Sequence, residues 1–253
     1  MGFKQQRRRQ LDSAIAAIQQ RYGVRAVTRG RAISPPVAYI PTGFPALDQA
    51  LGLGGLPRGH VCELVGPATS GKTTLALKFL AQAQAAGARG GLGTVGYIDQ
   101  ALYFDPDYAY RCGVDLSRLL VGTAHDLREA LATTEALAHG ASLSALVLDV
   151  LDFLWADSAA APCLAATFDR LPAFLERSHT ALLVLRESAT QSVPALHQAA
   201  VRLHIVRERW IERYGDVRGY EARVDILRNR FGPEGRQVKI EIEFNGTVQG
   251  DGL

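Results

Sequence analysis

Residues 66–74 read GPATSGKTT and carry the groups that a phosphate-binding loop requires. The stretch matches G-x-x-x-x-G-K-[ST] at every fixed position. Its glycines let the backbone curl so that successive N–H groups face inward, Lys72 is suited to neutralise terminal phosphates, and the Thr73 hydroxyl to ligate Mg²⁺. The alternative is a chance match in a turn. The candidate nucleotide-binding residues are Gly66, Pro67, Ala68, Thr69, Ser70, Gly71, Lys72, Thr73 and Thr74.

Magnesium held by such a loop also needs an acidic residue at the tip of a neighbouring strand. The apolar run 146–148 ends at Asp149, so we expect Asp149 and Thr73 to be the metal ligands. Asp152 is a weaker rival for this position, and Asp149 alternatively caps the next segment. These residues together predict ATP and Mg²⁺ as the cofactors.

The elements that must position these residues follow an alternating pattern. A strand at 60–66 enters the loop and a helix over 72–87 leaves it. Apolar runs and helical periodicities alternate as far as residue 187, which predicts a mostly parallel sheet with helices on both faces. Three segments after residue 201 alternate apolar and polar residues and predict antiparallel strands that extend the sheet. The expected fold class is α/β.

The chain before residue 41 differs from the rest. Apolar residues at helical spacing predict a helix over 8–22, and 24–32 is typical of a short edge strand. We therefore expect residues 1–40 to form a basic helical arm and 41–253 to form the core. The helix either folds onto its own domain or docks on another subunit, which would make the arm a means of self-association.

The charge is distributed unevenly along the 253 residues. Residues 1–31 carry eight basic side chains against Asp12 alone, a net +7, so the rest of a chain of total charge +3 sums to −4. The three cysteines form no CxxC pair, which argues against a disulfide framework or a zinc site. There is no signal-like or membrane-spanning apolar run, so we expect a cytoplasmic protein without a membrane partner.

The order of motifs resembles the RecA recombinase family over about residues 42–250. The matching pieces are PTGFPALDQALGLGGLPRGHVCELVGPATSGKTTLALKFL, TVGYID with DPDYAYRCGVDLSRLL, ALVLD and RVDILRNR. The resemblance implies a RecA-like P-loop core with an arm that packs on the adjacent subunit. It places Asp105, Tyr108 and Phe244 at the adenine. It also implies that Arg228 and Arg230 reach ATP across the subunit interface, unless they are an exposed basic strand face.

Two departures from that family concern hydrolysis. Ala101 stands where the family has the Glu that orients the attacking water, and Asp99 or Gln100 would have to replace it. Losing a general base costs on the order of 10²–10⁴ in rate. Glu187 stands at the γ-phosphate sensor, where its carboxylate repels phosphate unless Arg186 or a neighbour pairs with it. With Lys72 and Glu187 as the catalytic candidates, we expect nucleotide binding with slow hydrolysis.

The segments at the family's DNA-binding loops are also altered. The second loop would be residues 188–200, which contain no Arg, Lys or Gly and only His197 as a cation. Near the first loop, Trp155 is the one aromatic side chain expected to stack on bases. Phosphate contacts need several Lys or Arg side chains, so DNA binding through these loops is weakened. The basic arm remains a separate possible contact with DNA, or is simply a solvated helix face.

These losses leave different classes of function open. One is an active DNA-dependent ATPase recombinase that forms filaments on single-stranded DNA. Another is an ATP-binding accessory protein of DNA damage tolerance, similar to the ImuA type, whose partner would be an error-prone polymerase. A third is a regulator that binds a recombinase. The missing Glu and the altered loops favour an accessory or regulatory role with weak ATPase activity.

Overall fold

The computed structural model describes residues 2–22, 37–88, 93–140, 143–155, 157, 159–187 and 193–244. The chain forms two compact units, Met1–Val37 and Ala38–Leu253. The first unit contains helix α1 (Gly2–Tyr22), which begins earlier than the predicted helix at 8–22. The predicted strand at 24–32 lies outside the described residues. The use of this unit as an oligomerisation arm stays a prediction.

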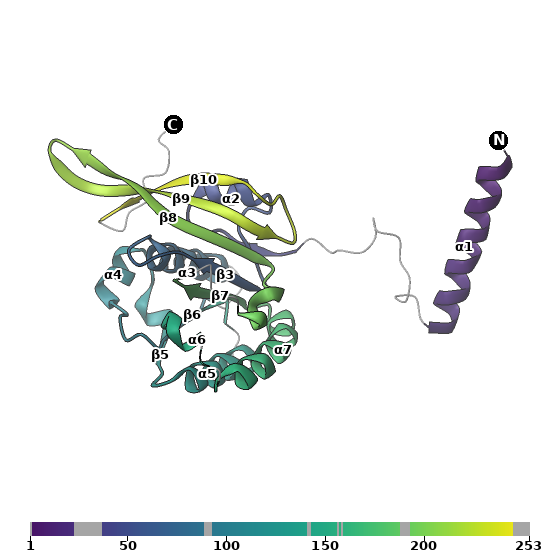
Figure 1. Cartoon of the computed structure of the whole chain (residues 1–253), viewed down its shortest axis with the longest axis horizontal. Helices are drawn as coiled ribbons and strands as arrows, with labels where there is room; N and C mark the ends of the chain where they lie inside the picture. The colour runs from purple at the N-terminus through teal and green to yellow at the C-terminus, as the bar shows by residue number, and fades with distance from the viewer. Residues whose placement is uncertain are drawn as a thin grey trace. The chain divides into compact units, whose positions relative to one another are not determined.

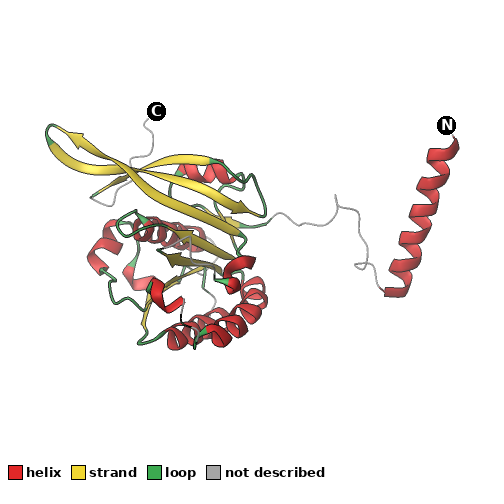
Figure 2. Cartoon of the chain, in the orientation of Figure 1, coloured by secondary structure: helices red, strands yellow, loops and turns green. Residues whose placement is uncertain are grey.

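The second unit is built on an eight-stranded sheet with the order β10-β9-β8-β3-β7-β6-β4-β5 within the described residues (Figures 1 and 2). The parallel strands are β3 (Val61–Val65), β4 (Val95–Asp99), β5 (Leu119–Thr123), β6 (Ala145–Asp149) and β7 (Ala181–Arg186). β8 (Val201–Arg213) pairs with β3 in parallel; β9 (Asp216–Asn229) and β10 (Gln237–Glu243) then add in antiparallel fashion. This arrangement confirms the predicted α/β class and the antiparallel extension. A small second sheet pairs β1 (Tyr39–Ile40) with β2 (Leu56–Pro57).

Helices cover both faces of the parallel strands, as the sequence predicts. α3 (Lys72–Ala88) leaves the tip of β3, and α2 (Pro45–Leu51) lies against β10. α5 (Leu127–Gly140) and α7 (Ala161–Ser178) pack against each other. The shorter elements are α4 (Pro106–Arg111), α6 (Asp152–Trp155) and the 3-10 helices η2 (Leu116–Arg118) and η3 (Pro194–Gln198).

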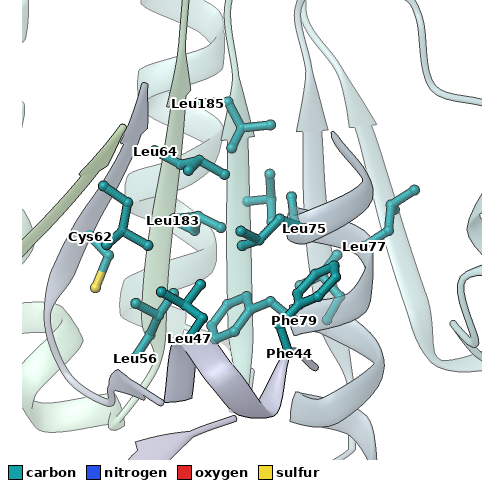
Figure 3. Close-up of a cluster of buried hydrophobic side chains, with 14 of the residues drawn as sticks. Phe44, Leu47, Leu56, Cys62, Leu64, Leu75, Leu77, Phe79, Leu183 and Leu185 are labelled. Atoms are coloured by element: carbon teal, nitrogen blue, oxygen red, sulfur yellow. The ribbon is translucent and has the colours of Figure 1, made fainter. Parts of the chain in front are cut away.

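The alternation of side chains along each strand divides the core into two clusters. On one face, Leu64, Leu183 and Leu185 of the sheet meet Leu75 and Phe79 of α3 (Figure 3). The other face packs against α5 and α7 through a second buried cluster. Strands β3, β4 and β7 are buried at every residue, which is typical of parallel strands covered on both sides.

The register of the parallel strands brings several chemically active residues to one edge. Asp99 at the end of β4 is opposite Asp149 at the end of β6, and Val65 at the end of β3 is opposite Arg186 at the end of β7. In open α/β sheets, ligands bind in the crevice outside the carboxyl ends of the strands. The phosphate-loop motif follows β3 directly, so the fold places it at this edge.

Candidate nucleotide-binding site

The loop between β3 and α3 has a backbone that only glycine permits at two points. A Cβ on Gly66 would lie 2.2 Å from the carbonyl oxygen of Ile205. Gly71 has φ +103°, and a Cβ there would lie 2.4 Å from Ile242 Cδ1. The two glycines of the motif are therefore required both for the curl of the loop and for its close approach to β8 and β10.

The side chain of Lys72 folds over the loop from the start of α3. Its Nζ donates to the carbonyl oxygens of Gly66 and Pro67 at 2.5 and 2.9 Å. Burial lowers the pKa of Lys72, whereas the carboxylates of Glu187, Asp149 and Asp152 oppose this. The ammonium group thus lies among three acidic side chains, and bound phosphate oxygens would give it partners in place of the two carbonyls.

Asp149 is held by a residue that the sequence reasoning missed. Tyr97 lies on β4 and its hydroxyl donates to Asp149 Oδ2 at 2.6 Å. Burial raises the pKa of Asp149, and the hydrogen bond from Tyr97 works against that rise. The Tyr97 side chain is itself 1% exposed. Tyr97 therefore fixes the orientation of the predicted metal-binding carboxylate.

The polar side chains at the tip of β4 hold its own loop and the segment after β6. The Asp99 carboxylate accepts the backbone N–H groups of Tyr103 and Phe104 at 3.3 and 2.8 Å. Gln100 Oε1 accepts the backbone N–H of Leu151 at 3.1 Å. Both side chains are at least nine-tenths buried. The expectation that Asp99 or Gln100 replaces the Glu missing at Ala101 finds no support, because both are already committed to the backbone.

The end of β7 connects to a buried ionic network. Arg186 contacts Glu63 of β3 at 3.0 Å and Asp152 at 3.7 Å, and Arg202 of β8 contacts Glu63 at 2.5 Å. Asp152 Oδ1 also accepts the backbone N–H of Glu187 at 3.1 Å. Asp152 therefore positions the Glu187 backbone. This fits the choice of Asp149 over Asp152 as the predicted metal ligand.

Two tyrosines contact Thr74 in the first turn of α3. The hydroxyls of Tyr108 and Thr74 share a hydrogen bond at 2.6 Å, and burial raises the pKa of Tyr108 to about 12. The Tyr220 hydroxyl also interacts with Thr74. Asp105 is the N-cap of α4 and accepts the Tyr108 backbone N–H at 3.0 Å. The structure thus places Tyr108 beside Thr74, with Asp105 holding the Tyr108 backbone. Contact of Asp105 and Tyr108 with adenine stays a prediction.

An exposed aromatic cluster lies next to these tyrosines, on β8 and just after β10. Phe244 lies 6.3 Å from Tyr220 and 6.1 Å from Trp210, measured between ring centroids. The Arg207 guanidinium lies 4.3 Å from the Trp210 ring centroid. The sequence reasoning placed Phe244 here but missed Trp210 and Arg207. Their position depends on a β-bulge, which leaves no signal in the residue pattern.

Arg228 and Arg230 lie away from this group of residues. Arg228 is opposite Arg202, which is itself opposite Glu63 in the middle of β3. The Arg228 guanidinium donates to the His197 carbonyl. The Arg230 N–H donates to Ala200, whose own N–H donates to Val61 at the start of β3. At about 3.3 Å per residue, the start of β3 lies about 16 Å from Gly66. The two arginines therefore face the opposite end of the sheet from the chain's own loop.

The segments that correspond to the DNA-binding loops are described only in part. Residues 188–192 lie outside the described residues, and Pro194–Gln198 form η3. Trp155 is 5% exposed and packs near Phe168, so the expectation that it is available to bases is wrong. Phe153 on the same short helix is 67% exposed. A helix of four residues is too short for periodicity to show which ring faces solvent.

The oxygen groups near the loop suit magnesium. Mg²⁺ is commonly held by one or two protein oxygens together with phosphate oxygens and water. The exposed Thr73 and the Asp149 carboxylate supply such a set. Among the described residues, no group of three or more His, Cys, Asp or Glu side chains forms a cage for a metal ion. Within the same residues, no helix has the length and apolar character needed to span a membrane.

Comparison with known proteins places the chain in one family. A family model for the RecA N-terminal domain matches residues 9–160. The chain is 32% identical to "Protein RecA" of Mycolicibacterium gilvum, covering 97% of this chain and 76% of that protein. "Protein RecA" of Frankia casuarinae is also 32% identical, with coverage of 97% and 77%. The fold matches the crystal structure of the RadB recombinase with a TM-score of 0.64 at 22% identity, over 82% of this chain and 97% of that one. The chain belongs to the RecA family.

Proposed function

We propose that this RecA-family protein binds ATP with Mg²⁺ at residues 66–74 and hydrolyses it slowly. Its role would be that of an accessory or regulatory protein in DNA repair and damage tolerance. The observation that carries the proposal is the tip of β4, where Ala101 supplies no base and the side chains of Asp99 and Gln100 are used by the backbone. Binding groups lie beside this tip, whereas its own polar side chains would not be free to activate water.

Nucleotide binding is supported by the groups gathered at the loop. Lys72 supplies the cation, and the backbone N–H groups and the start of α3 favour negative charge. Thr73 and Asp149 would hold Mg²⁺, which would bridge the phosphates and offset their charge. Asp105, Tyr108 and Phe244 would contact the base. Glu187 would contact bound water or the terminal phosphate region, as the remaining carboxylate near Lys72.

The accessory role draws on the altered DNA-binding segments and on the charge of the chain. The basic residues of the first 31 positions would make α1 and its surroundings the place for contact with DNA or a partner. The partner would be an error-prone polymerase or a recombinase, as for the similar ImuA-type proteins. Self-association would use α1 together with Arg228 and Arg230 of a second copy.

ATP turnover by the full chain, measured with and without single-stranded DNA, tests this proposal. We expect tight Mg²⁺-dependent ATP binding by calorimetry, with turnover that is slow and nearly unchanged by DNA. The Lys72→Ala chain controls for contaminating ATPases. Turnover that DNA stimulates strongly would contradict the accessory role.

The second candidate is an active recombinase that forms filaments on DNA. It is favoured by the names of the similar proteins, which are RecA proteins and a RadB recombinase. A strand-exchange assay with labelled oligonucleotides separates the two candidates. Exchange that depends on ATP would establish the recombinase, whereas nucleotide binding without exchange would support the accessory protein.

A further inference from the structure

The hairpin of β8 and β9 presents an arginine and exposed rings on the sheet face that carries the nucleotide loop. We infer that Arg207 and Trp210, together with Phe244, form a platform for the base of the bound nucleotide and favour purines over pyrimidines. This inference rests on the proposed binding of a nucleotide at residues 66–74. In Figure 1, β8 and β9 extend well past the parallel strands. The pairing of β8 with β3 ends at His204, so Arg207 and Trp210 lie beyond the end of β3.

A β-bulge determines which face of the hairpin carries Trp210. Arg207 is opposite Ala222, and the register then shifts so that Trp210 is opposite Tyr220. Without the extra residue, strict alternation would place Trp210 on the opposite face from Arg207. The bulge therefore brings Arg207 and Trp210 to the face that carries Tyr220 and the core residue Ala222.

Tyr220 connects this cluster to the phosphate loop. A Cβ on Gly71 would lie 3.1 Å from the Tyr220 hydroxyl, so that ring reaches the loop itself. Trp210 lies 5.9 Å from Tyr220 between centroids, with the rings nearly perpendicular at 86°. Trp210 and Phe244 are each 48% exposed. The half-exposed rings of Trp210 and Phe244 thus lie next to Tyr220, which itself reaches the loop. They are within reach of the base of a nucleotide whose phosphates the loop binds.

Arg207 differs from the arginines that lie nearest the turn of the hairpin. Arg209, Arg213 and Arg218 each contact a carboxylate, at 3.0, 4.0 and 3.2 Å respectively. In the part of the chain that the structure describes, no carboxylate pairs with Arg207, which contacts the rings of Trp210 and Tyr220 instead. A guanidinium held flat on an aromatic ring can stack on a base and donate to acceptors such as purine N7.

The chain offers a direct optical test because Trp155 and Trp210 are its two tryptophans. Trp155 is buried on α6, whereas Trp210 is half-exposed. In the full-length Trp155→Phe chain, we expect ATP to quench the remaining emission in a saturable manner. Inorganic tripolyphosphate, which has no base, should bind without this quenching. The matched Trp210→Phe chain should show little response to either compound.

Calorimetry with Mg²⁺ then measures the contribution of the platform to affinity. When alanine replaces an aromatic side chain on which a base stacks, binding weakens because the stacking is lost. Trp210→Ala should therefore weaken ATP binding about tenfold. CTP should be affected less, and tripolyphosphate not at all. Trp210→Phe should retain most of the ATP affinity, and Arg207→Ala should weaken ATP more than tripolyphosphate.

The outcomes separate this inference from the proposed function on which it rests. Equal affinity for ATP and CTP, with ATP binding unchanged in Trp210→Ala and Arg207→Ala, would overturn the platform and leave the loop intact. Failure of ATP, CTP and tripolyphosphate to bind at all would overturn both. Weakening by Trp210→Ala that is equal for ATP and tripolyphosphate would show a structural role for Trp210, and would also overturn the platform.

Discussion

The tips of β3 and β4 lie at the same edge of one sheet but use their polar groups in opposite ways. After β3, the Lys72 ammonium donates to two backbone carbonyls of the loop, which phosphate oxygens can replace. After β4, the Asp99 carboxylate and the Gln100 amide bind backbone N–H groups, and Ala101 has no polar group at all. The polar group after β3 would be available to a ligand, whereas those after β4 hold the backbone of their own loop and of the segment after β6.

If the chain binds ATP as we propose, this contrast assigns the binding and the hydrolysis of the nucleotide to separate parts of the same fold. The phosphate loop needs its own glycines and lysine, and these depend little on the strand beside it. Activation of water would need a free acceptor at the tip of β4. A protein can therefore lose the second capacity while the first remains, and variants at the two tips should affect different measurements.

The largest effect is expected at the tip of β3. Lys72→Ala removes the cation that would face the terminal phosphates, and hydrogen bonds to charged groups each contribute about 1.5–3 kcal/mol. We expect ATP affinity to fall at least about 100-fold by calorimetry. The melting temperature should stay nearly the same, because within the described residues the hydrogen bonds of Nζ go to two carbonyls of its own loop. Unchanged ATP affinity would mean that the loop does not bind phosphate.

The next effect concerns the tip of β4. Ala101→Glu introduces a carboxylate at the position where the family resemblance implies the catalytic Glu, so ATP turnover should rise at least about tenfold. Affinity for ATP should change little. Ala101→Gln is the matched control, since a Gln side chain has nearly the same size as Glu but cannot accept a proton. If the Glu and Gln variants turn over ATP equally slowly, the missing base does not limit hydrolysis.

A smaller effect is expected at the contact between Tyr97 of β4 and Asp149 of β6. Tyr97→Phe removes the O–H that opposes the burial-raised pKa of Asp149, so this pKa should rise further. Asp149 must be ionised to hold Mg²⁺. As the pH is lowered, Mg²⁺-dependent ATP binding should therefore be lost earlier in the Tyr97→Phe chain, at a higher pH than in the unchanged chain. Tyr108→Phe, which affects Thr74 instead, should leave this pH profile in place.

The smallest effect should appear in stability alone. Asp99→Asn keeps one acceptor oxygen, now uncharged, and leaves one backbone N–H, of Tyr103 or Phe104, without an acceptor. We expect a loss of about 1 kcal/mol in the free energy of unfolding, or about 2–4 °C in melting temperature. ATP affinity should not change. A large change in ATP binding with unaltered melting would assign Asp99 to the ligand site.

The sequence was sufficient for most of the fold and for the phosphate loop. The loop depends on local spacing, since Gly66, Gly71 and Lys72 lie within seven residues of the chain. The alternation of apolar runs likewise predicts the parallel strands, because strands buried on both faces are nearly continuous in their hydrophobicity. These features can be predicted without knowing which strands pair with each other.

The features that escaped prediction depend on register or on irregular geometry. Tyr97 contacts Asp149 only because β4 and β6 pair with Asp99 opposite Asp149. Trp210 shares a face with Arg207 only because of the bulge between Arg207 and Arg209. In both cases the deciding feature is the way one strand pairs with another, so residue spacing along the chain gave no signal.

The placement of Arg228 and Arg230 at the end of the sheet opposite the phosphate loop has a consequence for symmetry. Were these arginines to reach a nucleotide on a second copy, each molecule would have two different contact surfaces, a head and a tail. A pair related by a two-fold axis cannot satisfy such contacts equally, because a two-fold interface joins identical surfaces. Head-to-tail contacts give a ring if the rotation closes and an open helix if it does not. A chain lacking only the two arginines would then still accept a neighbour at its loop, and would end the growth of an assembly in one direction alone.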